Sequence, residues 1–257
     1  INRTNSKKAL VFLHGLGGDL TAWRQETDYF QNLGISTIAV DLRGHGFSDK
    51  SDKKDFYSLN NFSEDILSIM RYEKFDSYTT VGHCFGGMIA LILESGHNYS
   101  SKNLVLVDTI YKPPILVESI KNNWFITKIL EMIISILPKN HKHKHIDFKL
   151  FSNTNDLDLK RIVSDILHTS LKSYLLMCEK LMNFDANELL KGILIPTLIV
   201  EGTNDTIFPP EIALKLKKRI KRSELDVIPA ANHIIVLNNP QDLEVDIDKF
   251  LRKTNFL

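Results

Sequence analysis

The sequence is short of cysteine, of net charge and of long apolar runs, and each shortage argues against a class of protein. Its 257 residues include two cysteines, Cys84 and Cys178, too few for a disulfide framework, so a reducing, cytoplasmic location is the expectation. A formal net charge of +1 gives no general attraction to nucleic acid or to an anionic membrane. No apolar run reaches the ~18 residues of a membrane-spanning helix. These absences favour a globular protein whose partner is a small molecule.

Composition and length bound the architecture. The chain is 43% hydrophobic and 25% charged, as globular proteins usually are, and its length fits one large α/β domain with an insertion or two small domains. It shows neither internal repeats nor a low-complexity tract. The first residue is Ile1, which is consistent with the removal of a leader or a tag. The sequence leaves the oligomeric state open.

Short apolar runs alternate with helical patterns along most of the chain. The runs expected to form strands are residues 8–13, 35–40, 77–81, 103–107, 195–200 and 225–228. Apolar side chains recur at helical spacing in residues 21–33, 59–73, 209–221 and 243–251. Strands that alternate with helices predict a mostly parallel sheet that is covered by helices on both faces.

The alternation is interrupted between residues 111 and 190, where the pattern is helical and contains no convincing strand. We predict a helical lid, residues 111–190, inserted into one core that consists of residues 1–110 and 191–257. The same amphipathic helices could equally form a dimer surface. Helices are expected at residues 115–137, which Pro138 ends, at 156–169 and at 171–184.

Gly82 and Gly86 flank Cys84 at two positions on either side, after an apolar strand and before a helical run. This spacing is that of a nucleophile elbow, in which a strand turns sharply into a helix. The turn strains the backbone of the central residue, and flanking glycines remove the collisions that side chains would cause. Amides at the start of the helix would favour a thiolate on Cys84. The alternative is a buried structural cysteine beside packing glycines, the commoner fate of a lone cysteine.

Polar residues also follow three other predicted strands, at residues 14–18, 202–205 and 232–233. The carboxyl ends of parallel strands lie at one edge of a sheet, where sites form. Cys84, Asp205 and His233 therefore occur in the chain order nucleophile, acid, base. His233 would take the proton of Cys84, and Asp205 would orient the imidazole and stabilise its cation. Taken singly, Asp205 could be a helix-cap residue and His233 a surface histidine.

Together these motifs resemble those of the α/β-hydrolase family, from about Lys8 to the C-terminus. Among its members the sequence is similar to the single-lid esterase, lactonase and peroxidase-like group. The resemblance implies an α/β-hydrolase fold with an oxyanion hole formed by the backbone N–H groups of Leu16 and Phe85. The matching signatures are His14-Gly15 with its glycines, Asp41-x-Arg43-Gly44-His45-Gly46-x-Ser48, the elbow, Gly202-x-x-Asp205 and the late His233.

The function expected from these residues is hydrolysis of carboxylic esters, thioesters or lactones through an acyl-enzyme on Cys84. Such chemistry needs no cofactor, because the nucleophile does the covalent work. Trp124 and Phe125 could line an apolar pocket for a hydrophobic part of the substrate, or they could be the lid's own core. Two alternatives stay open: an acyltransferase that passes the acyl group from Cys84 to an acceptor other than water, and a binding protein without turnover.

Three features depart from the family's pattern. Most relatives carry serine where this chain has Cys84, although dienelactone hydrolases and polyhydroxyalkanoate synthases use cysteine, and the residue could also replace a natural serine. Asn232 precedes His233 where glycine is usual. Only about seven residues precede the first strand, so the antiparallel strands that commonly begin the sheet should be shortened or absent.

Other polar residues have weaker claims to the site. Asp41, Arg43 and His45 are expected to form a network of hydrogen bonds and ion pairs that supports the site loops. Asp108 also follows a strand and is an alternative acid, since related folds use that position.

The histidines of the lid and the second cysteine are expected to be structural. His141, His143 and His145 alternate with lysines, and such tracts can bind metal. No Cys, Asp or Glu joins them at ligand spacing, so we expect a solvated loop and no metal site. Cys178 recurs at helical spacing with Tyr174 and Leu181, which predicts a core position.

Overall fold

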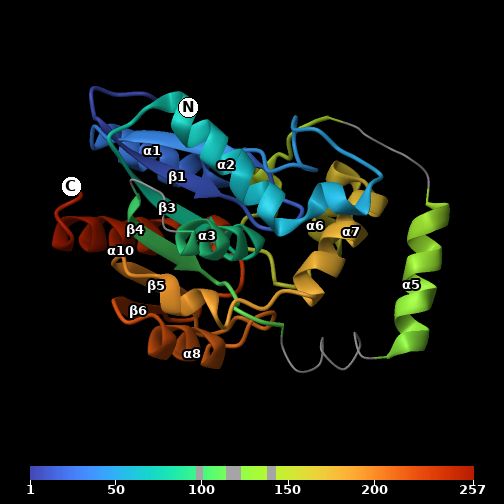
Figure 1. Ribbon diagram of the computed structural model, residues 1–257. Coiled ribbons are helices and arrows are strands. Elements are labelled where there is room, and N and C mark those ends of the chain that lie inside the picture. Colours follow the sequence, from blue (N-terminus) through green and yellow to red (C-terminus); the bar gives the residue numbers. More distant parts are fainter. Residues whose placement is uncertain (97–100, 114–122, 138–142) are drawn as a thin grey trace.

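A single parallel sheet forms the centre of the molecule. The computed structural model describes residues 1–96, 101–113, 123–137 and 143–257, except the side chains of residues 124–127 and 130. Within these ranges, six strands lie in the order β2-β1-β3-β4-β5-β6, and all neighbours are parallel (Figure 1). The strands are β1 (Lys8–Leu13), β2 (Ser36–Val40), β3 (Ser77–His83), β4 (Ser101–Val107), β5 (Thr197–Gly202) and β6 (Ser223–Ile228).

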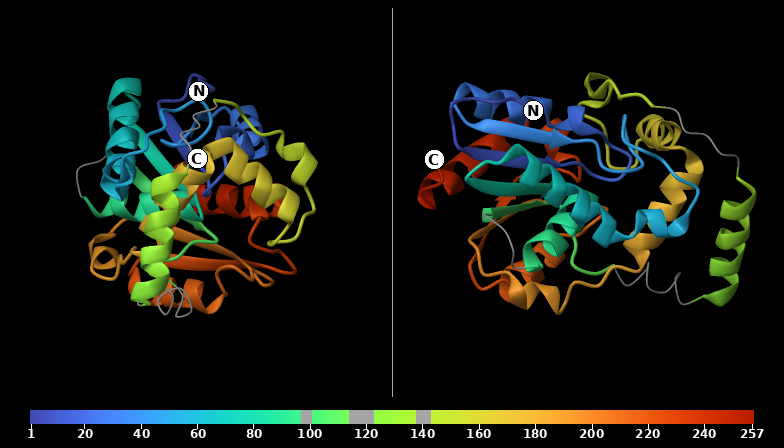
Figure 2. Two further views of the ribbon diagram at one scale, coloured as in Figure 1. Left: turned by 90° about the vertical axis from the view of Figure 1, so that its right-hand side faces the viewer. Right: turned by 45° about the horizontal axis from the view of Figure 1, so that its top comes forward.

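Helices cover both faces of this sheet (Figures 1 and 2). One face carries α1 (Arg24–Asn32) and α10 (Pro240–Lys253), and the other carries α2 (Leu59–Glu73), α3 (Phe85–Ser95) and α8 (Glu211–Arg219). The short α9 (Ile235–Asn238) precedes α10. Single 3-10 turns occur at Leu20–Trp23, Lys54–Tyr57, Phe148–Phe151 and Leu189–Gly192.

Strand β1 shows why the sequence forms two apolar layers. Leu10 and Phe12 point to the face of α1 and α10, where the ring of Phe12 lies 5.1 Å from that of Trp23, centre to centre. Val11 and Leu13 point to the opposite face and join the cluster formed with α2 and α3. Because side chains alternate along a strand, burial on both faces requires a continuous apolar run, as this segment has.

Three described helices between β4 and β5 lie beyond the carboxyl ends of the strands (Figures 1 and 2). They are α5 (Trp124–Ile136), α6 (Leu159–Thr169) and α7 (Leu171–Met182). Helix α7 is attached to the core, because the hydroxyl of Tyr57 donates to Oγ of Ser173 over 2.8 Å. Helix α5 stands farther out, and its Met132 and Ile136 are 59% and 74% exposed.

The predicted fold class is confirmed, and all six predicted strands overlap observed ones. β3 continues two residues beyond the prediction, to His83, because the strand runs into the glycine-flanked turn. The helix predicted from residue 156 begins at Leu159 instead, after Asp158, whose carboxylate accepts the N–H of Arg161 over 2.8 Å. Antiparallel pairing in the described chain is an isolated bridge between Asn2 and Thr37.

The first part of the helix predicted at 115–137, and the Pro138 expected to end it, lie outside the described residues. Among the helices that are described, none combines the length and the apolar composition that a membrane crossing requires.

Candidate active site

Cys84 lies at the turn between β3 and α3. Its backbone angles, φ 51° and ψ −113°, are rare for a residue with a side chain. The flanking glycines make the turn feasible: a Cβ on Gly82 would lie 2.6 Å from the carbonyl oxygen of Gly86, and one on Gly86 would overlap the carbonyl oxygen of Leu13. The strand, turn and helix expected from the Gly-x-Cys-x-Gly spacing are therefore present.

Backbone hydrogen bonds hold the turn at Cys84 in place. The N–H of Cys84 donates to the carbonyl oxygen of Val107 over 3.0 Å, and its own carbonyl oxygen accepts the hydroxyl of Thr109 over 2.7 Å. Thr109 also fills the space that a side chain at Gly87 would need, 2.5 Å from its Oγ1. The end of β4 and the residues after it thus hold the backbone of the elbow in place.

The loop after β1 lies against the same turn. A Cβ on Gly15 would be 3.4 Å from the Cβ of Cys84 and 2.9 Å from Nδ1 of His83. Leu16, the next residue, packs against the apolar cluster that includes Cys84. Phe85 is the first residue of α3, so its N–H has no partner within the helix. That the N–H groups of Leu16 and Phe85 form an oxyanion hole stays a prediction.

Asp205 and His233 meet at the same edge of the sheet. Nδ1 of His233 lies 2.7 Å from Oδ2 of Asp205. The other oxygen of Asp205 accepts the N–H groups of Ile207 and Phe208, each over 2.7 Å, so the carboxylate has a fixed orientation. The ring of Phe208 packs edge-on against the imidazole at 4.9 Å between centres. Both polar side chains are buried.

The charge state of His233 follows from its burial and from two neighbours, Cys84 and Asp205. Burial alone would lower the pKa of His233, but the negative charge and hydrogen bond of Cys84, together with the hydrogen bond and charge of Asp205, raise it well above its ordinary value. The protonated imidazole is therefore favoured in this site. The structure brings together the three residues that the sequence predicts as nucleophile, acid and base.

Two further buried carboxyl groups lie behind the His233–Asp205 pair. Oxygen atoms of Asp108, Glu201 and Asp205 all lie within 4.8 Å of one another. Burial raises the pKa of Asp108 to about 8 and that of Glu201 to about 10, so both are neutral at pH 7. Asp108 instead accepts the N–H of Gly202 over 3.1 Å. The geometry therefore favours Asp205 over Asp108 as the partner of His233.

His83 joins the elbow to the loop that carries the histidine. Its Nε2–H donates to the carbonyl oxygen of His233 over 2.9 Å. Burial, and then the charge of His233, lower the pKa of His83 to about 3. His83 is thus a neutral donor, which the sequence did not reveal because its partner, the carbonyl oxygen of His233, lies 150 residues away in the chain.

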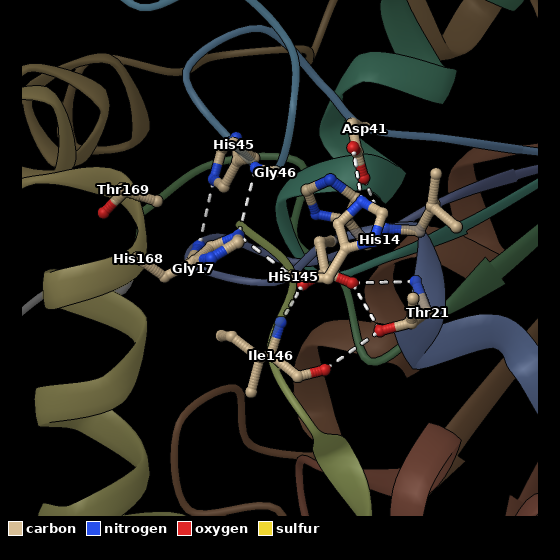
Figure 3. Close-up of polar contacts among 12 residues, drawn as sticks. His14, Gly17, Thr21, Asp41, His45, Gly46, His145, Ile146, His168 and Thr169 are labelled. Carbon is tan, nitrogen blue, oxygen red and sulfur yellow. Dashed lines mark hydrogen bonds and ion pairs between the residues drawn. The ribbon is translucent and has the colours of Figure 1, made fainter. Parts of the chain in front are cut away.

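Three neutral histidines connect the site loops (Figure 3). Nε2 of His14 accepts the N–H of Leu42 over 3.1 Å, and Nε2 of His45 accepts the N–H of Gly17 over 3.1 Å. His168 of α6 accepts the N–H of Gly46 over 3.0 Å. Burial lowers the pKa of all three, to about 4 for His168. These three hydrogen bonds link the loop after β1 to the loop after β2, and the loop after β2 to helix α6.

A second group of contacts in Figure 3 brings His145 to the core. Its Nε2–H donates to Oδ2 of Asp41 over 2.8 Å, and Oδ2 of Asp19 accepts the N–H of Ile146 over 2.7 Å. The expectation of a fully solvated histidine loop is therefore wrong for His145, whose carboxylate partner lies 104 residues away in the chain. His141 lies outside the described residues.

Asp41 and Arg43 both make hydrogen bonds that support the loop after β2, but the ion-pair partner of Arg43 is Asp65 rather than Asp41. Its guanidinium donates to both oxygens of Asp65, each over 2.8 Å, and lies 4.5 Å above the ring of Phe56. Asp41 accepts the N–H groups of Leu20 and Phe47, each over 2.9 Å. These bonds shape the loop rather than provide groups for chemistry.

Among the described residues, three sets of side chains have potential metal-ligand atoms within 4.8 Å of one another: His83, Asp108 and His233; Asp19, Asp41 and His145; Asp108, Glu201 and Asp205. In each set these groups already make hydrogen bonds to protein groups or hold protons. A cation would have to displace them, so the sets are explained as structural.

Helix α7 provides the described groups that lie over Cys84. A Cβ on Gly17 would lie 3.3 Å from Cε2 of Tyr174, so this ring packs on the loop after β1. Burial, and then the charge of Cys84, raise the pKa of Cys178 to about 12. Cys178 is only partly exposed on this helix. The side chains of Trp124 and Phe125 lie outside the described part, so their predicted contact with substrate stays a prediction.

The fold and these residues define an α/β-hydrolase. The sequence matches the family described as "Serine aminopeptidase, S33" over residues 4–241, and the chain belongs to this family. The family description names a serine, whereas this chain has Cys84 at the elbow.

Individual relatives are distant. The chain is 23% identical over 265 residues to Epoxide hydrolase 3 from Xenopus tropicalis, covering 95% of this chain and 71% of that protein. It is 22% identical over 249 residues to 3-oxoadipate enol-lactonase 2 from Acinetobacter baylyi, covering 97% and 90%. The solved enol-lactonase from Burkholderia xenovorans LB400 superposes with a TM-score of 0.73 at 18% identity, covering 96% and 92%. The chain spans 54–66% of the length of several other curated relatives.

Proposed function

We propose that this chain hydrolyses carboxylic esters, thioesters or lactones with a hydrophobic part, through Cys84, His233 and Asp205. The observation that carries the proposal is the convergence at one sheet edge of a strained cysteine at a helix N-terminus and a histidine 2.7 Å from a buried carboxylate. The full-length similarity to an enol-lactonase supports an acyl substrate.

The first half of the reaction forms an acyl-enzyme. The thiolate of Cys84 attacks the carbonyl carbon, and the N–H groups of Leu16 and Phe85 stabilise the resulting oxyanion. Such donors typically contribute about 3 kcal/mol each to transition-state stabilisation. The intermediate then breaks its bond to the alcohol or thiol, which leaves with the proton of the His233 imidazolium.

The second half restores the enzyme. His233, now neutral, takes a proton from water, whose oxygen attacks the thioester carbon. The carboxylic acid leaves, and the thiolate and imidazolium form again. Asp205 keeps the imidazole in the required tautomer throughout and stabilises its positive charge.

We further propose that residues 111–190 form a cap over this site. Cys84 is 8% exposed and His233 7% exposed, so other parts of the protein cover both side chains. Tyr174 of α7 supports the proposal, because its ring lies against Gly17 in the loop after β1. Trp124 and Phe125 of α5 are the candidates for a contact with the hydrophobic part of the substrate.

The proposal is tested by intact-protein mass spectrometry after exposure to a panel of acyl esters, thioesters and lactones. We expect a mass increment of one acyl group on Cys84, absent in Cys84→Ala and formed more slowly in His233→Ala. Free carboxylic acid as the final product identifies hydrolysis, whereas transfer to an added alcohol or amine identifies an acyltransferase. Undiminished ester turnover in Cys84→Ala would reject the nucleophile assignment.

A further inference from the structure

Asp156, in the segment between β4 and β5, connects the loops of the proposed acid and base. Its side chain is buried, with 6% exposure. Oδ1 accepts the backbone N–H of His233 over 2.8 Å. Oδ2 accepts both the N–H and the hydroxyl of Thr206, over 2.9 and 2.6 Å. One carboxylate thus accepts three hydrogen bonds from two loops that lie 50 and 77 residues away in the chain.

These bonds fix the backbone next to both partners of the His233–Asp205 pair. Thr206 directly follows Asp205, and the bond to His233 is made by that residue's own amide. Hydrogen bonds to an ionised acceptor are shorter and stronger than neutral ones, so they restrict the position of the two loops more firmly. A change at Asp156 would therefore alter the imidazole's position without removing any reacting group.

The same part of the chain has a second attachment, at Thr154. Its carbonyl oxygen accepts the side-chain amides of Asn232 and Asn238, each over 2.9 Å. Asn232 is the residue that stands where the α/β-hydrolase pattern has glycine. Its amide here binds the inserted segment, and its Oδ1 accepts the N–H of Ile234 over 3.1 Å.

Asp156 is in turn held by α6. The guanidinium of Arg161 donates to the carbonyl oxygen of Asp156 over 2.6 Å, and to Oδ2 of Asp165 over 3.1 Å. Asp165 packs on Gly17, where a Cβ would lie 2.5 Å from the Cβ of Asp165. Arg161 and Asp165 thus connect Asp156 to the loop that follows β1.

We propose that Asp156 is a positioning residue for His233. The imidazole takes its working position only when residues 153–156 are hydrogen-bonded to the loop that carries His233. This inference rests on the proposed function, since it assigns a role within the same Cys84–His233 pair. The segment between β4 and β5 would thus help to position the base His233 as well as cover the substrate.

The test uses the pH dependence of Cys84 alkylation by iodoacetamide in the full chain, read by peptide mass spectrometry, with the thermal midpoint of each variant. Asp156→Asn keeps the shape but turns one acceptor oxygen into a donor, so a bond to His233 or to Thr206 is lost. We expect the midpoint of the Cys84 profile to rise by about one pH unit, a roughly tenfold slower reaction at a fixed pH below it. Asp158→Asn, in the same segment but at the cap of α6, should leave the profile in place.

The variant His233→Ala distinguishes a failure of the proposed function from a failure of the role proposed for Asp156. If it leaves the Cys84 profile unchanged, the proposed function itself is wrong. If it moves the profile while Asp156→Asn lowers only the thermal midpoint, Asp156 is merely structural and the inference is overturned. Thr206→Val, which removes one donor to Asp156, is the milder variant should Asp156→Asn fail to fold. A smaller shift in the same direction supports the inference, and an unchanged profile rejects it.

Discussion

Gly86 lies so close to the carbonyl group of Leu13 that any side chain at position 86 would overlap it. The elbow therefore requires glycine for packing against the neighbouring strand as well as for the turn itself. Backbone atoms cannot move aside as the end of a flexible side chain can. We expect Gly86→Ala to lower the free energy of unfolding by about 3 kcal/mol or more, despite alanine's higher helix propensity. Chemical denaturation measures the loss.

The matched control for that substitution is Gly96→Ala, at the other end of the same helix. A Cβ there would meet its nearest neighbour, the carbonyl oxygen of Leu93, at an ordinary 3.6 Å. We expect a change within about 0.5 kcal/mol. Equal losses at the two positions would show that packing at the elbow is not the cause.

Cys84→Ser tests whether the site is adapted to sulfur. A hydroxyl is much harder to deprotonate than a thiol, so the change places a greater demand on His233. In a sulfur-adapted site we expect turnover to fall tenfold or more, about 1.4 kcal/mol in barrier height. Steady-state kinetics on one responsive ester provide the measurement. Higher turnover in Cys84→Ser would indicate a site built for serine.

The two cysteines should differ in reactivity. Burial raises the pKa of Cys178 to about 12, while Cys84 faces an imidazolium and a helix N-terminus. We expect iodoacetamide to modify Cys84 at a pH well below that needed for Cys178. Peptide mapping by mass spectrometry across a pH series checks this, and equal modification of both would contradict an activated thiol.

Trp124 and Phe125 should set the preference for acyl-chain length. We expect the double alanine variant to change the ratio of kcat/KM between short and long acyl esters more than it changes the thermal midpoint. Met132→Ala is the control on the same helix, because that side chain is 59% exposed. A collapse in stability with an unchanged ranking of substrates would instead make Trp124 and Phe125 part of the cap's own core.

Glu94 should make stability depend on pH. Burial raises its pKa to about 7, although Thr80 donates to Oε1 over 2.7 Å. Between its ordinary value of 4.5 and about 7, the folded state binds the proton more tightly than the unfolded state, so stability falls as pH rises through this window. Glu94→Gln removes the titration.

The difference between Glu94→Gln and the parent chain is the measurement. It should grow from near zero at pH 4.5 to as much as about 3 kcal/mol at pH 8, in favour of the variant. Urea denaturation at several pH values gives both curves. A constant difference across the series would show that Glu94 is not buried as a neutral acid.

Local patterns in the sequence predicted the sheet and the meeting of Cys84, Asp205 and His233. Apolar runs buried on both faces are visible at once, and the carboxyl ends of parallel strands must share an edge. Helix α9 was missed because four residues are too few to show helical periodicity. The bounds of β3 were missed because Gly82 and His83 do not look like strand residues.

The contacts that could not be predicted join residues distant in the chain. Asp156 looked like the start of a helix, and nothing near it in sequence indicates partners at Thr206 and His233. His145 looked like part of a solvated basic tract, whereas its partner is Asp41. Each of these contacts depends on how the inserted segment packs, which no local periodicity encodes.

The neutral histidines around the site loops have a consequence for behaviour in acid. His14, His45 and His168 each offer a lone pair to a backbone N–H, and a protonated ring has no lone pair to offer. Because burial lowers their pKa values, to about 4 for His168, these rings stay neutral at a lower pH than an exposed histidine would. Acidification would protonate these rings, and each accepted hydrogen bond would be replaced by repulsion between two N–H donors. The hydrogen bonds between the strands of the sheet would stay intact. The loops after β1 and β2 would therefore separate from each other and from α6 before the sheet unfolds.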